Sequence, residues 1–436
     1  MTIKEITKET IAVVGLGSEN FALLNFLFTK KIIFPITIFA FQGRQEIERH
    51  YPELEKWNHI TWVISKPSFI RLKKFSLILK SPGAFFSPEL RKQLKESEVK
   101  VLAPMQLFLD FCPSKNIIGV TGTKGKGTTS SIIAAILKKD GKKVWLGGNI
   151  GVAPFSFIQK IKSTDWVILE LSSFQLEDMT SSPHISIFTN FTPEHLSAAD
   201  KNNPNYHPSL TRYWRAKLNI VRHQTENDYA VINGCLEDEI KNAKLKSEVI
   251  FFTTSTLSSN LPGDHNKENI AAAETVAELL NIPKAVVAAA VKSFKGLPYR
   301  LEKVADKQGI LYYNDSFATT PSATITALKA FDQPVILIAG GADKGSNFKQ
   351  LGRVIKQQNV KAVILFKGTA LKKLILTLYK KSAIINIASS MPLAVKKAQK
   401  LAEKGDVILL SPACASFGLF KNYKDRGEQF NRIVKI

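Results

Sequence analysis

The sequence predicts an α/β protein of three domains: an N-terminal Rossmann-like domain (residues 1–104), a central domain with a mostly parallel sheet (105–297) and a C-terminal Rossmann-like domain (298–436). Two observations support this prediction. Short apolar runs alternate with helical patterns along all 436 residues, which is typical of βαβ units and parallel sheets. One run, 117–121, enters the glycine-rich turn 122–129 ahead of a helix, so the central domain is predicted to be of the P-loop ATPase type.

The first domain opens with an apolar strand, Ile11–Val14, which leads through a glycine turn into a helix rich in Leu and Phe. This opening is Rossmann-like, but Asn20 stands in place of the third glycine of the dinucleotide fingerprint. The next strand, Ile36–Phe39, also lacks the acidic end that holds a ribose, so a dinucleotide site is not favoured. A further strand, Phe75–Leu79, ends in the turn 80–83, whose backbone could hold a phosphate or a sugar.

The phosphate loop of the central domain reads Gly-Thr-Lys-Gly-Lys-Gly-Thr-Thr from residue 122 to 129. Backbone N–H groups of such a loop, with the N-terminus of the following helix (expected over Ser130–Lys139 with Gly141 at its end), form a cradle for phosphate oxygens. Lys126 can reach the outer phosphates, and Thr128 offers a hydroxyl to Mg²⁺. The alternative is a flexible turn that happens to be rich in Gly and Lys, which the flanking strand and helix disfavour.

Polar residues follow the other strands of the central domain, where open parallel sheets bind ligands. These strands are predicted at Val144–Leu146, Trp166–Leu169, Ile185–Phe188, Tyr229–Ile232 and Val249–Phe252. Glu170 follows a buried strand and is the acid expected for magnesium beside a phosphate loop, with a solvated strand end as the alternative. His195 follows the next strand and is a candidate metal or substrate ligand. Lys217, on its helix pattern alone, is predicted to be solvent-exposed.

The third domain repeats the pattern of strands that end in polar turns. The strands are predicted at Ile310–Tyr313, Val335–Ala339, Ala362–Phe366 and Val407–Leu410. The turns that follow them are 314–316, 340–345, 367–369 and 411–416. A second ligand-binding edge is therefore expected in this domain.

Composition limits the class of protein. The formal net charge of +23 suits an anionic partner, but the lysines are scattered and not gathered in a block with interleaved aromatic residues. Steering of small anionic substrates is favoured, and a nucleic-acid-dependent P-loop ATPase is the alternative. The three cysteines lie far apart and are expected to be reduced thiols. No apolar run is long enough for a membrane span, and the first one ends in a glycine turn, unlike a signal peptide.

A set of stretches distributed over the chain resembles the Mur ligase family. They are Gly-Thr-Lys-Gly-Lys-Gly-Thr-Thr (122–129), Glu-Leu-Ser-Ser-Phe-Gln-Leu (170–176), Asn-Phe-Thr-Pro-Glu-His-Leu (190–196), Arg-Ala-Lys (215–217), Leu-Pro-Gly-Asp-His-Asn-Lys-Glu-Asn (261–269), Gly-Leu-Pro-Tyr-Arg (296–300), Asn-Asp-Ser-Phe-Ala-Thr-Thr-Pro (314–321), Ser-Pro-Ala-Cys-Ala-Ser (411–416) and Phe-Lys-Asn-Tyr (420–423). The phosphate loop alone would be shared with folylpolyglutamate synthases, but those enzymes start directly at the ATPase domain.

The resemblance implies a cytoplasmic, monomeric ATP-dependent amide ligase of peptidoglycan precursor synthesis, and hence of cell wall biogenesis, cell shape and cell division. It is strongest to the branch that joins D-glutamate to UDP-N-acetylmuramoyl-L-alanine through an acyl phosphate. Nucleic acid and stable membrane insertion are not expected. Two Mg²⁺ ions are expected beside ATP, with Lys217 carbamoylated by carbon dioxide.

The resemblance also assigns roles to residues. For catalysis these are Lys126, Glu170, His195 and Lys217; for ATP they are Gly122, Thr123, Lys124, Gly125, Lys126, Gly127, Thr128, Thr129, Asn266, Asn269, Arg300 and Asp315. Metal ligands are Thr128, Glu170, His195 and Lys217. The UDP portion falls to Ser18, Ser81 and Gly83, the muramoyl-alanine to Asn149 and His195, and the incoming glutamate to Thr319, Lys344, Ser416 and Tyr423.

Three positions depart from the pattern of this branch. Gly127 replaces a hydroxyl residue after the loop lysine, which shifts the expected magnesium contact to Thr128 or to water. The second strand ends in Ala40-Phe41-Gln42, without the usual Asp-x-Arg of uridine recognition. Phe317 stands where a lysine is usual, which changes the polar contacts of the third domain.

Overall fold

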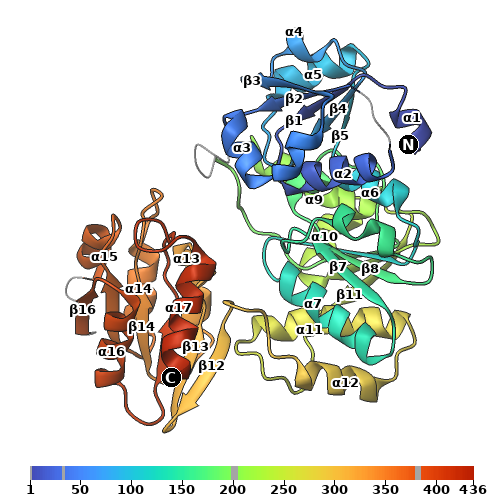
Figure 1. Ribbon diagram of the computed structural model, residues 1–436. Coiled ribbons are helices and arrows are strands. Elements are labelled where there is room, and N and C mark those ends of the chain that lie inside the picture. Colours follow the sequence, from blue (N-terminus) through green and yellow to red (C-terminus); the bar gives the residue numbers. More distant parts are fainter. Residues whose placement is uncertain (1, 32–34, 198–204, 379–383) are drawn as a thin grey trace. The chain divides into compact units, whose positions relative to one another are not determined.

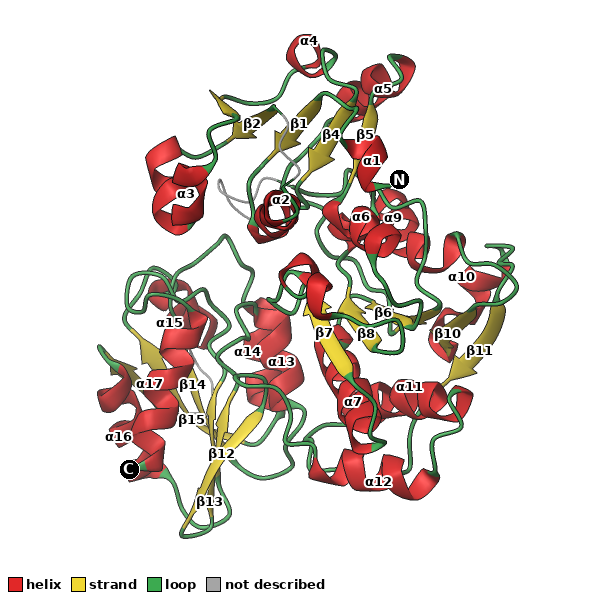
Figure 2. Ribbon diagram, turned by 45° about the vertical axis from the view of Figure 1, so that its right-hand side comes forward, coloured by secondary structure: helices red, strands yellow, loops and turns green. Residues whose placement is uncertain are grey.

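The computed structural model describes residues 2–31, 35–197, 205–378 and 384–436. The chain divides into two compact units, one of Met1–Leu257 with Glu268–Val291 and one of Ser258–Lys267 with Lys292–Ile436. Over the described residues the first unit contains two β-sheets and the second contains one, each flanked by helices (Figures 1 and 2). The predicted α/β fold with mostly parallel sheets is confirmed.

The first sheet has the strand order β3-β2-β1-β4-β5, and its pairs are parallel. Its strands are β1 (Ile11–Val14), β2 (Ile36–Ala40), β3 (Ile60–Ile64), β4 (Leu77–Lys80) and β5 (Lys100–Leu102). The helices of this region are α1 (Ile3–Ile6), α2 (Ser18–Thr29), α3 (Arg44–His50), η1 (Pro52–Lys56), α4 (Phe69–Leu72), α5 (Pro88–Glu96) and α6 (Pro104–Phe111). The ends of β1 and β4 lie side by side, which brings the turns after them together.

The second sheet has the order β11-β10-β9-β6-β8-β7 and is also parallel. Its strands are β6 (Ile117–Thr121), β7 (Val144–Gly148), β8 (Trp166–Glu170), β9 (Ile185–Phe188), β10 (Tyr229–Asn233) and β11 (Glu248–Phe252). The helices are α7 (Lys126–Lys139), η2 (Pro154–Ser156), η3 (Ile158–Lys160), α8 (Ser173–Leu176), α9 (Leu210–Arg222), η4 (Gly234–Leu236), α10 (Glu237–Lys241), α11 (His265–Leu279) and α12 (Lys284–Ser293). Because β6 lies between β8 and β9, the phosphate loop, Glu170 and the residues after β9 share one edge.

The sheet of the second unit has the order β12-β13-β17-β14-β15-β16, with β12 antiparallel to β13. Its strands are β12 (Glu302–Lys307), β13 (Ile310–Asn314), β14 (Val335–Ala339), β15 (Val360–Phe366), β16 (Ile384–Ala388) and β17 (Val407–Leu410). The helices are α13 (Pro321–Leu328), α14 (Lys349–Gln357), α15 (Leu371–Leu378), α16 (Met391–Leu401) and α17 (Tyr423–Lys435). Separate apolar cores cover its two faces, one formed with α13, α14 and α15 and the other with α16 and α17.

Some element predictions differ from the structure. Helix α7 begins at Lys126, four residues before the predicted start, and β4 is shifted to Leu77–Lys80, so Lys80 belongs to the strand. The sequence reading also missed β3, β5, β12 and β16. These four strands lie at the edges of their sheets and are partly exposed. β5 and β12 contain charged residues, and one polar residue interrupts the apolar run of β3 and of β16.

An apolar core joins the first sheet to the second through α2, α6 and η2. Beside this core a cluster of four charged side chains spans the same junction. Lys80 Nζ lies 3.0 Å from Asp178 Oδ2 and 3.4 Å from Glu177 Oε2, and Arg91 donates to both carboxylates at 2.5 and 2.6 Å. Burial alone would raise the pKa of Asp178, but Lys80 and Arg91 hold it below its ordinary value. Lys80 is 1% exposed, so this pairing is what allows its charge to be buried.

Asp178→Ala should lower the free energy of unfolding by roughly 3 kcal/mol, because it leaves the buried Lys80 ammonium with a weaker counter-charge. Urea unfolding followed by circular dichroism measures this. Glu96→Ala is the matched control, since Glu96 pairs with Lys92 on the surface at 3.8 Å. The control should change the free energy by less than about 0.5 kcal/mol. Equal losses in the two variants would contradict a structural role for the cluster.

Candidate active site

The phosphate loop has a backbone that only glycine can adopt at two points. Gly122 has a φ of +146°, and a Cβ there would lie 2.0 Å from Thr189 Oγ1. Gly125 has a φ of +83° and forms the N-cap of α7, where a Cβ would lie 2.3 Å from Asn269 Oδ1. The loop is therefore pressed against β9 and α11, and its glycines are required by close approach as well as by backbone angle. This explains why α7 starts directly after Gly125, earlier than predicted.

Lys126 lies in the first turn of α7 with its ammonium folded over the loop. Its Nζ donates to the carbonyl oxygens of Gly122 and Thr123, each at 2.9 Å. The other loop residues are also fixed: Thr123 Oγ1 lies 3.1 Å from Tyr213 Oη, and the Lys124 N–H donates to Asn190 Oδ1 at 2.9 Å. A positive side chain and a helix N-terminus thus meet at one place, which is the arrangement that favours phosphate.

Glu170 is buried at the end of β8, next to the loop. One carboxylate oxygen, Oε1, accepts a hydrogen bond from Asn149 Nδ2 at 2.7 Å. The other, Oε2, is buried and has no hydrogen-bond partner among the described residues. An acceptor of this kind fits a cation, because a carboxylate oxygen is costly to bury without a partner. Thr128 lies in the first turn of α7, which follows β6, the neighbour of β8 in the sheet.

No group of three or more His, Cys, Asp or Glu side chains suited to a metal occurs in the part of the chain that the structure describes. A cation beside Glu170 would therefore depend on oxygen ligands other than these side chains, such as a hydroxyl, phosphate oxygens or water. Mg²⁺ is commonly held in this way, by one or two carboxylates and the phosphates of a nucleotide. The donor set present fits Mg²⁺ better than it fits a closed zinc site.

The prediction that Lys217 is solvent-exposed is wrong. Lys217 projects from α9 into the interior and is 2% exposed. Its Nζ donates to the carbonyl oxygen of Gly122 at 2.5 Å and lies 4.9 Å from the centre of the Tyr213 ring. Burial, and then the neighbouring charge of Lys126, lower the pKa of Lys217 well below its ordinary value. The helix pattern missed this because α9 presents a polar residue on its buried face.

His195 follows β9 and has a backbone φ of +59°, which residues other than glycine rarely adopt. Its ring lies 5.2 Å from that of Phe174 and 6.0 Å from that of Tyr213, while Nε2 lies 3.8 Å from Glu194. The side chain is 45% exposed. Partial burial lowers the pKa of His195, so the imidazole favours its neutral form, which can bind a metal or accept a hydrogen bond.

The sequence reading missed His207, which is fully buried behind His195. Its ring stacks on Phe174 with centroids 4.7 Å apart, and Nε2 lies 2.9 Å from Ser173 Oγ. The His207 backbone N–H donates to the His195 carbonyl at 2.8 Å. Burial is the main cause that lowers the pKa of His207 to about 4, so it is neutral at physiological pH. No local motif predicts that His207 is buried here, because the residues that it contacts lie elsewhere in the sequence.

The structure brings the candidate UDP residues Ser18 and Ser81 to neighbouring turns after β1 and β4. Ser18 starts α2, and Ser81 donates its backbone N–H to the Val14 carbonyl at 2.9 Å. A Cβ on Gly15 would lie 3.1 Å from Ser81 Cβ, so the two turns are in close contact. Gly83 follows in the second of these turns.

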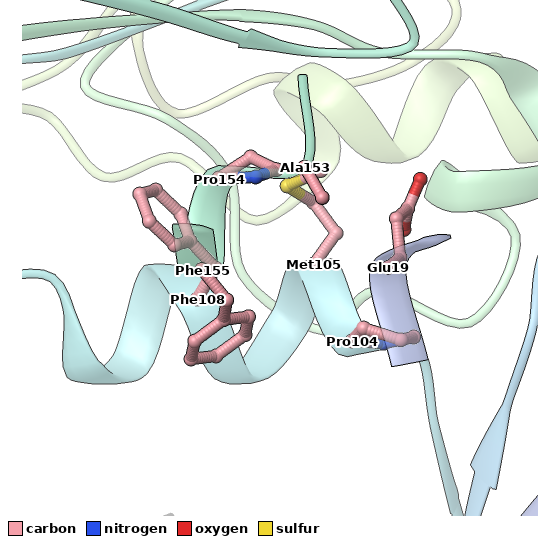
Figure 3. A pocket seen from close by; sticks show the side chains of 7 residues that line it. All are labelled: Glu19, Pro104, Met105, Phe108, Ala153, Pro154 and Phe155. Carbon is pink, nitrogen blue, oxygen red and sulfur yellow. The ribbon is translucent and has the colours of Figure 1, made fainter. Parts of the chain in front are cut away.

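Glu19, next to Ser18, is buried beside an apolar pocket (Figure 3). The pocket is lined by Glu19, Pro104, Met105, Phe108, Ala153, Pro154 and Phe155. Glu19 Oε1 accepts a hydrogen bond from Gln175 Nε2 at 2.5 Å, and burial raises the pKa of Glu19 to about 7. This bond ties the first turn of α2 to α8, the helix that follows Glu170.

Two asparagines that the resemblance assigns to ATP lie in the first turns of α11. Asn266 Nδ2 donates to the Pro262 carbonyl at 2.8 Å. Asn269 Oδ1 accepts from Thr129 Oγ1 at 3.2 Å, so it touches the helix that follows the phosphate loop. Both asparagines are buried.

In the second unit, Asp315 is a buried anchor between the ends of β13 and β17. It accepts hydrogen bonds from Ser411 Oγ at 2.8 Å and from the Leu301 N–H at 3.2 Å. Burial raises the pKa of Asp315 to about 7, against the opposing effect of these hydrogen bonds and of Arg300. The carboxyl therefore fixes the segment 300–301 to the turn after β13.

The other candidates of the second unit lie in the turns that follow its strands. Lys344 follows β14, and its Nζ lies 5.3 Å from the centre of the Phe417 ring. Ser416 is buried after β17, and Tyr423 is the first residue of α17. The Thr319 N–H donates to the Phe317 carbonyl at 2.9 Å. The structure thus collects these residues at the carboxyl ends of adjacent strands, where ligands of such sheets bind.

Comparison with known proteins identifies the family of this chain. The Mur ligase middle domain matches residues 120–256, and the glutamate ligase domain of Mur ligases matches 299–414. A UDP-N-acetylmuramoylalanine–D-glutamate ligase from Acetivibrio thermocellus is 35% identical over 99% of this chain and 97% of its own length. A protein of the same name from Clostridium botulinum is 36% identical over 98% of this chain and 97% of its own length. The chain belongs to the Mur ligase family. It is accordingly an ATP-dependent ligase.

Solved structures share the fold of this Mur ligase. A MurF ligase from Thermotoga maritima in complex with ADP has a TM-score of 0.61 at 18% identity, over 98% of this chain and 96% of that one. A folylpolyglutamate synthase/dihydrofolate synthase from Yersinia pestis, complexed with AMPPNP and a manganese ion, has a TM-score of 0.55 at 17% identity, over 75% of this chain and 91% of that one. At these identities the likeness establishes the fold alone. No helix of the described residues has the length and apolarity to cross a membrane.

The burial of Lys217 predicts an unusual pH dependence of stability. Below pH 10.5 the unfolded chain protonates this amine, whereas the folded chain does so only at a much lower pH. The folded state is therefore penalised between the two pKa values, and the penalty fades as the pH rises toward 10.5. Lys217→Met should make the protein more stable at pH 7, by on the order of 1–2 kcal/mol, with a smaller gain at pH 10.

Urea unfolding at both pH values in carbon dioxide-free buffer measures the effect. Lys138→Met, at an exposed position of α7, is the control and should show no such trend. A Lys217→Met variant that is less stable than the wild type at pH 7, or a gain that grows with pH, would show that the amine is not penalised.

Proposed function

We propose that this Mur ligase uses ATP to join D-glutamate to UDP-N-acetylmuramoyl-L-alanine in peptidoglycan precursor synthesis. The observation that carries the proposal is the alignment, over nearly all of the chain, with relatives named for that reaction. The geometry around the phosphate loop supports it, because a buried lysine, a buried carboxylate and a histidine all lie beside a loop that suits phosphates.

The proposed division into domains assigns 1–104 to the UDP substrate, 105–297 to ATP and 298–436 to the amino acid and to closure over ATP. The strand order β3-β2-β1-β4-β5 supports a Rossmann-like first domain, and the mostly parallel third sheet supports a Rossmann-like last domain. Activity as a cytoplasmic monomer, independent of nucleic acid, is part of the same proposal.

The reaction would proceed in two steps. The substrate carboxylate attacks the γ-phosphorus of ATP, the bond to the bridging oxygen breaks, and ADP and an acyl phosphate form. The amine of D-glutamate then attacks the acyl carbon, the amide bond forms, and phosphate leaves as the amine loses its proton. Phosphoryl transfer needs its charge to be positioned and neutralised more than it needs covalent chemistry from the protein. The ammonium of Lys126 and the N–H groups of residues 122–129 would do this.

Two Mg²⁺ ions, when bound, would neutralise charge on the transferring phosphoryl group. Thr128 and Glu170 would hold the first, and the unpartnered Oε2 of Glu170 supports that role. His195 and Lys217 would hold the second. An ammonium repels a cation, so Lys217 is proposed to react with carbon dioxide, the neutral amine adding to carbon to give a carbamate and one proton. Burial favours the neutral amine that this addition requires.

The remaining contacts are proposed from the resemblance to the family. Ser18, Ser81 and Gly83 would bind the UDP portion, and Asn149 and His195 the muramoyl-alanine. Asn266, Asn269, Arg300 and Asp315 would serve ATP, and Thr319, Lys344, Ser416 and Tyr423 the glutamate. The rival activity, that of a folylpolyglutamate synthase, leaves the first sheet without a role.

Lys217→Ala should reduce turnover by at least about a hundredfold, because the second metal position loses its anionic ligand. A small carboxylic acid such as formate or acetate should restore part of the activity by replacing the carbamate. Intact mass spectrometry of the wild type in bicarbonate should also show a labile addition of carbon dioxide. The exposed Lys138→Ala is the control for altered charge. Full activity of Lys217→Ala without additive would refute the proposal for this lysine.

Product formation with D-glutamate, L-glutamate and neutral amino acids tests the substrate. D-Glutamate should be preferred, and Lys344→Ala should raise its KM by roughly tenfold or more while changing that of ATP less, because a cation facing a carboxylate is lost. Lys349→Ala, on the exposed start of α14, is the matched control. A preference for a neutral amino acid would overturn the substrate, and an unchanged KM for glutamate would overturn the role of Lys344.

A further inference from the structure

Phe317, which stands where a lysine is usual in this branch of the family, has a defined partner in the structure. The guanidinium carbon of Arg300 lies 3.8 Å from the centre of the Phe317 ring. Cation–π contacts extend to about 6 Å, so at this distance the guanidinium is in close contact with the ring face. On another side, Phe317 meets the ring of Tyr423 edge-on, with centroids 5.0 Å apart at 88°. The ring is still 40% exposed, so hydrophobic burial alone does not account for its placement.

The backbone holds both members of this pair in register. The Phe317 N–H donates to the carbonyl of Tyr299, the residue before Arg300, at 3.0 Å. The N–H of Leu301, the residue after Arg300, donates to Asp315 Oδ1 at 3.2 Å. The residues before and after Arg300 are therefore hydrogen-bonded to the turn that carries Phe317. This places the Arg300 side chain beside the ring.

The chemistry of the pair indicates what it does. A guanidinium whose face lies over a ring has its N–H donors in its own plane, and this planar fork matches an anion with two oxygens, such as a phosphate. A lysine at position 317 would place a second positive charge against Arg300. An aromatic ring instead restrains the long side chain, which lowers the entropy lost when Arg300 binds.

We propose that Phe317 is a positioning residue that holds Arg300 for the phosphate groups of the nucleotide. In this chain the aromatic ring substitutes for the lysine by orienting the neighbouring cation and not by supplying one. The inference rests on the proposed use of ATP. It predicts that Phe317 acts on the nucleotide through Arg300 and has a smaller effect on glutamate.

The test uses the full-length protein, four single variants and one double variant. Isothermal calorimetry measures the Kd of ADP with Mg²⁺, steady-state assays measure KM for ATP and for glutamate, and thermal unfolding reports stability. Phe317→Leu should weaken ADP binding and raise the KM for ATP by roughly two- to fivefold, with kcat and the KM for glutamate changed less. Phe317→Tyr, which keeps the ring, should behave as the wild type. Phe317→Lys should weaken ADP binding at least as much as Phe317→Leu.

A double-mutant cycle shows whether Arg300 transmits the effect. Arg300→Met should weaken ADP binding, and adding Phe317→Leu to it should weaken binding no further. The inference is overturned if Phe317→Leu leaves the Kd unchanged, if it has the same effect with and without Arg300, or if it lowers only the unfolding temperature. If the wild type binds ADP with this dependence but forms no amide product, the proposed function is wrong and the role of Phe317 stands.

Discussion

Two lysine side chains converge on one backbone oxygen at the edge of the second sheet. Lys126, from the helix after the phosphate loop, and Lys217, from α9, both donate to the carbonyl of Gly122. It is unfavourable for both of these amines to be protonated at such close range, unless an anion lies nearby. Three features of the surrounding structure depend on this meeting point. A side chain on Gly122 would clash with its neighbours, and Tyr213 lies against Lys217. Glu170 ends the strand next to the one that leads into the loop. The arrangement favours neutralisation of the Lys217 amine and binding of phosphate.

The sequence predicted the parts of this site that depend on local order in the chain. The phosphate loop and the polar residues after β8 and β9 could be identified because a parallel sheet brings its carboxyl ends to one edge. Burial of Lys217 could not be identified, since a lysine on a helix is ordinarily exposed and its partner lies 95 residues away. His207 was missed for the same reason: its contacts with Ser173 and Phe174 join distant segments.

Differences in the fold have a similar origin. Central strands, buried on both faces, appear in the sequence as continuous apolar runs and were predicted to within a few residues. The edge strands β3, β5, β12 and β16 were missed; they are partly exposed, and polar or charged residues break their apolar runs. Phe317 shows the converse case: the sequence identified it as a departure, but only the structure reveals the cation that it contacts.

The charged cluster at the junction of the first two sheets has a thermal consequence. Hydration of ions becomes less favourable as temperature rises, so the cost of keeping Lys80 and Asp178 out of water decreases on heating. Their attraction is also little affected by dissolved salt, because counter-ions cannot reach side chains that are 1% and 8% exposed. The electrostatic part of the link between the first sheet and the phosphate-loop sheet should therefore contribute relatively more in a warm cell than in a cold one.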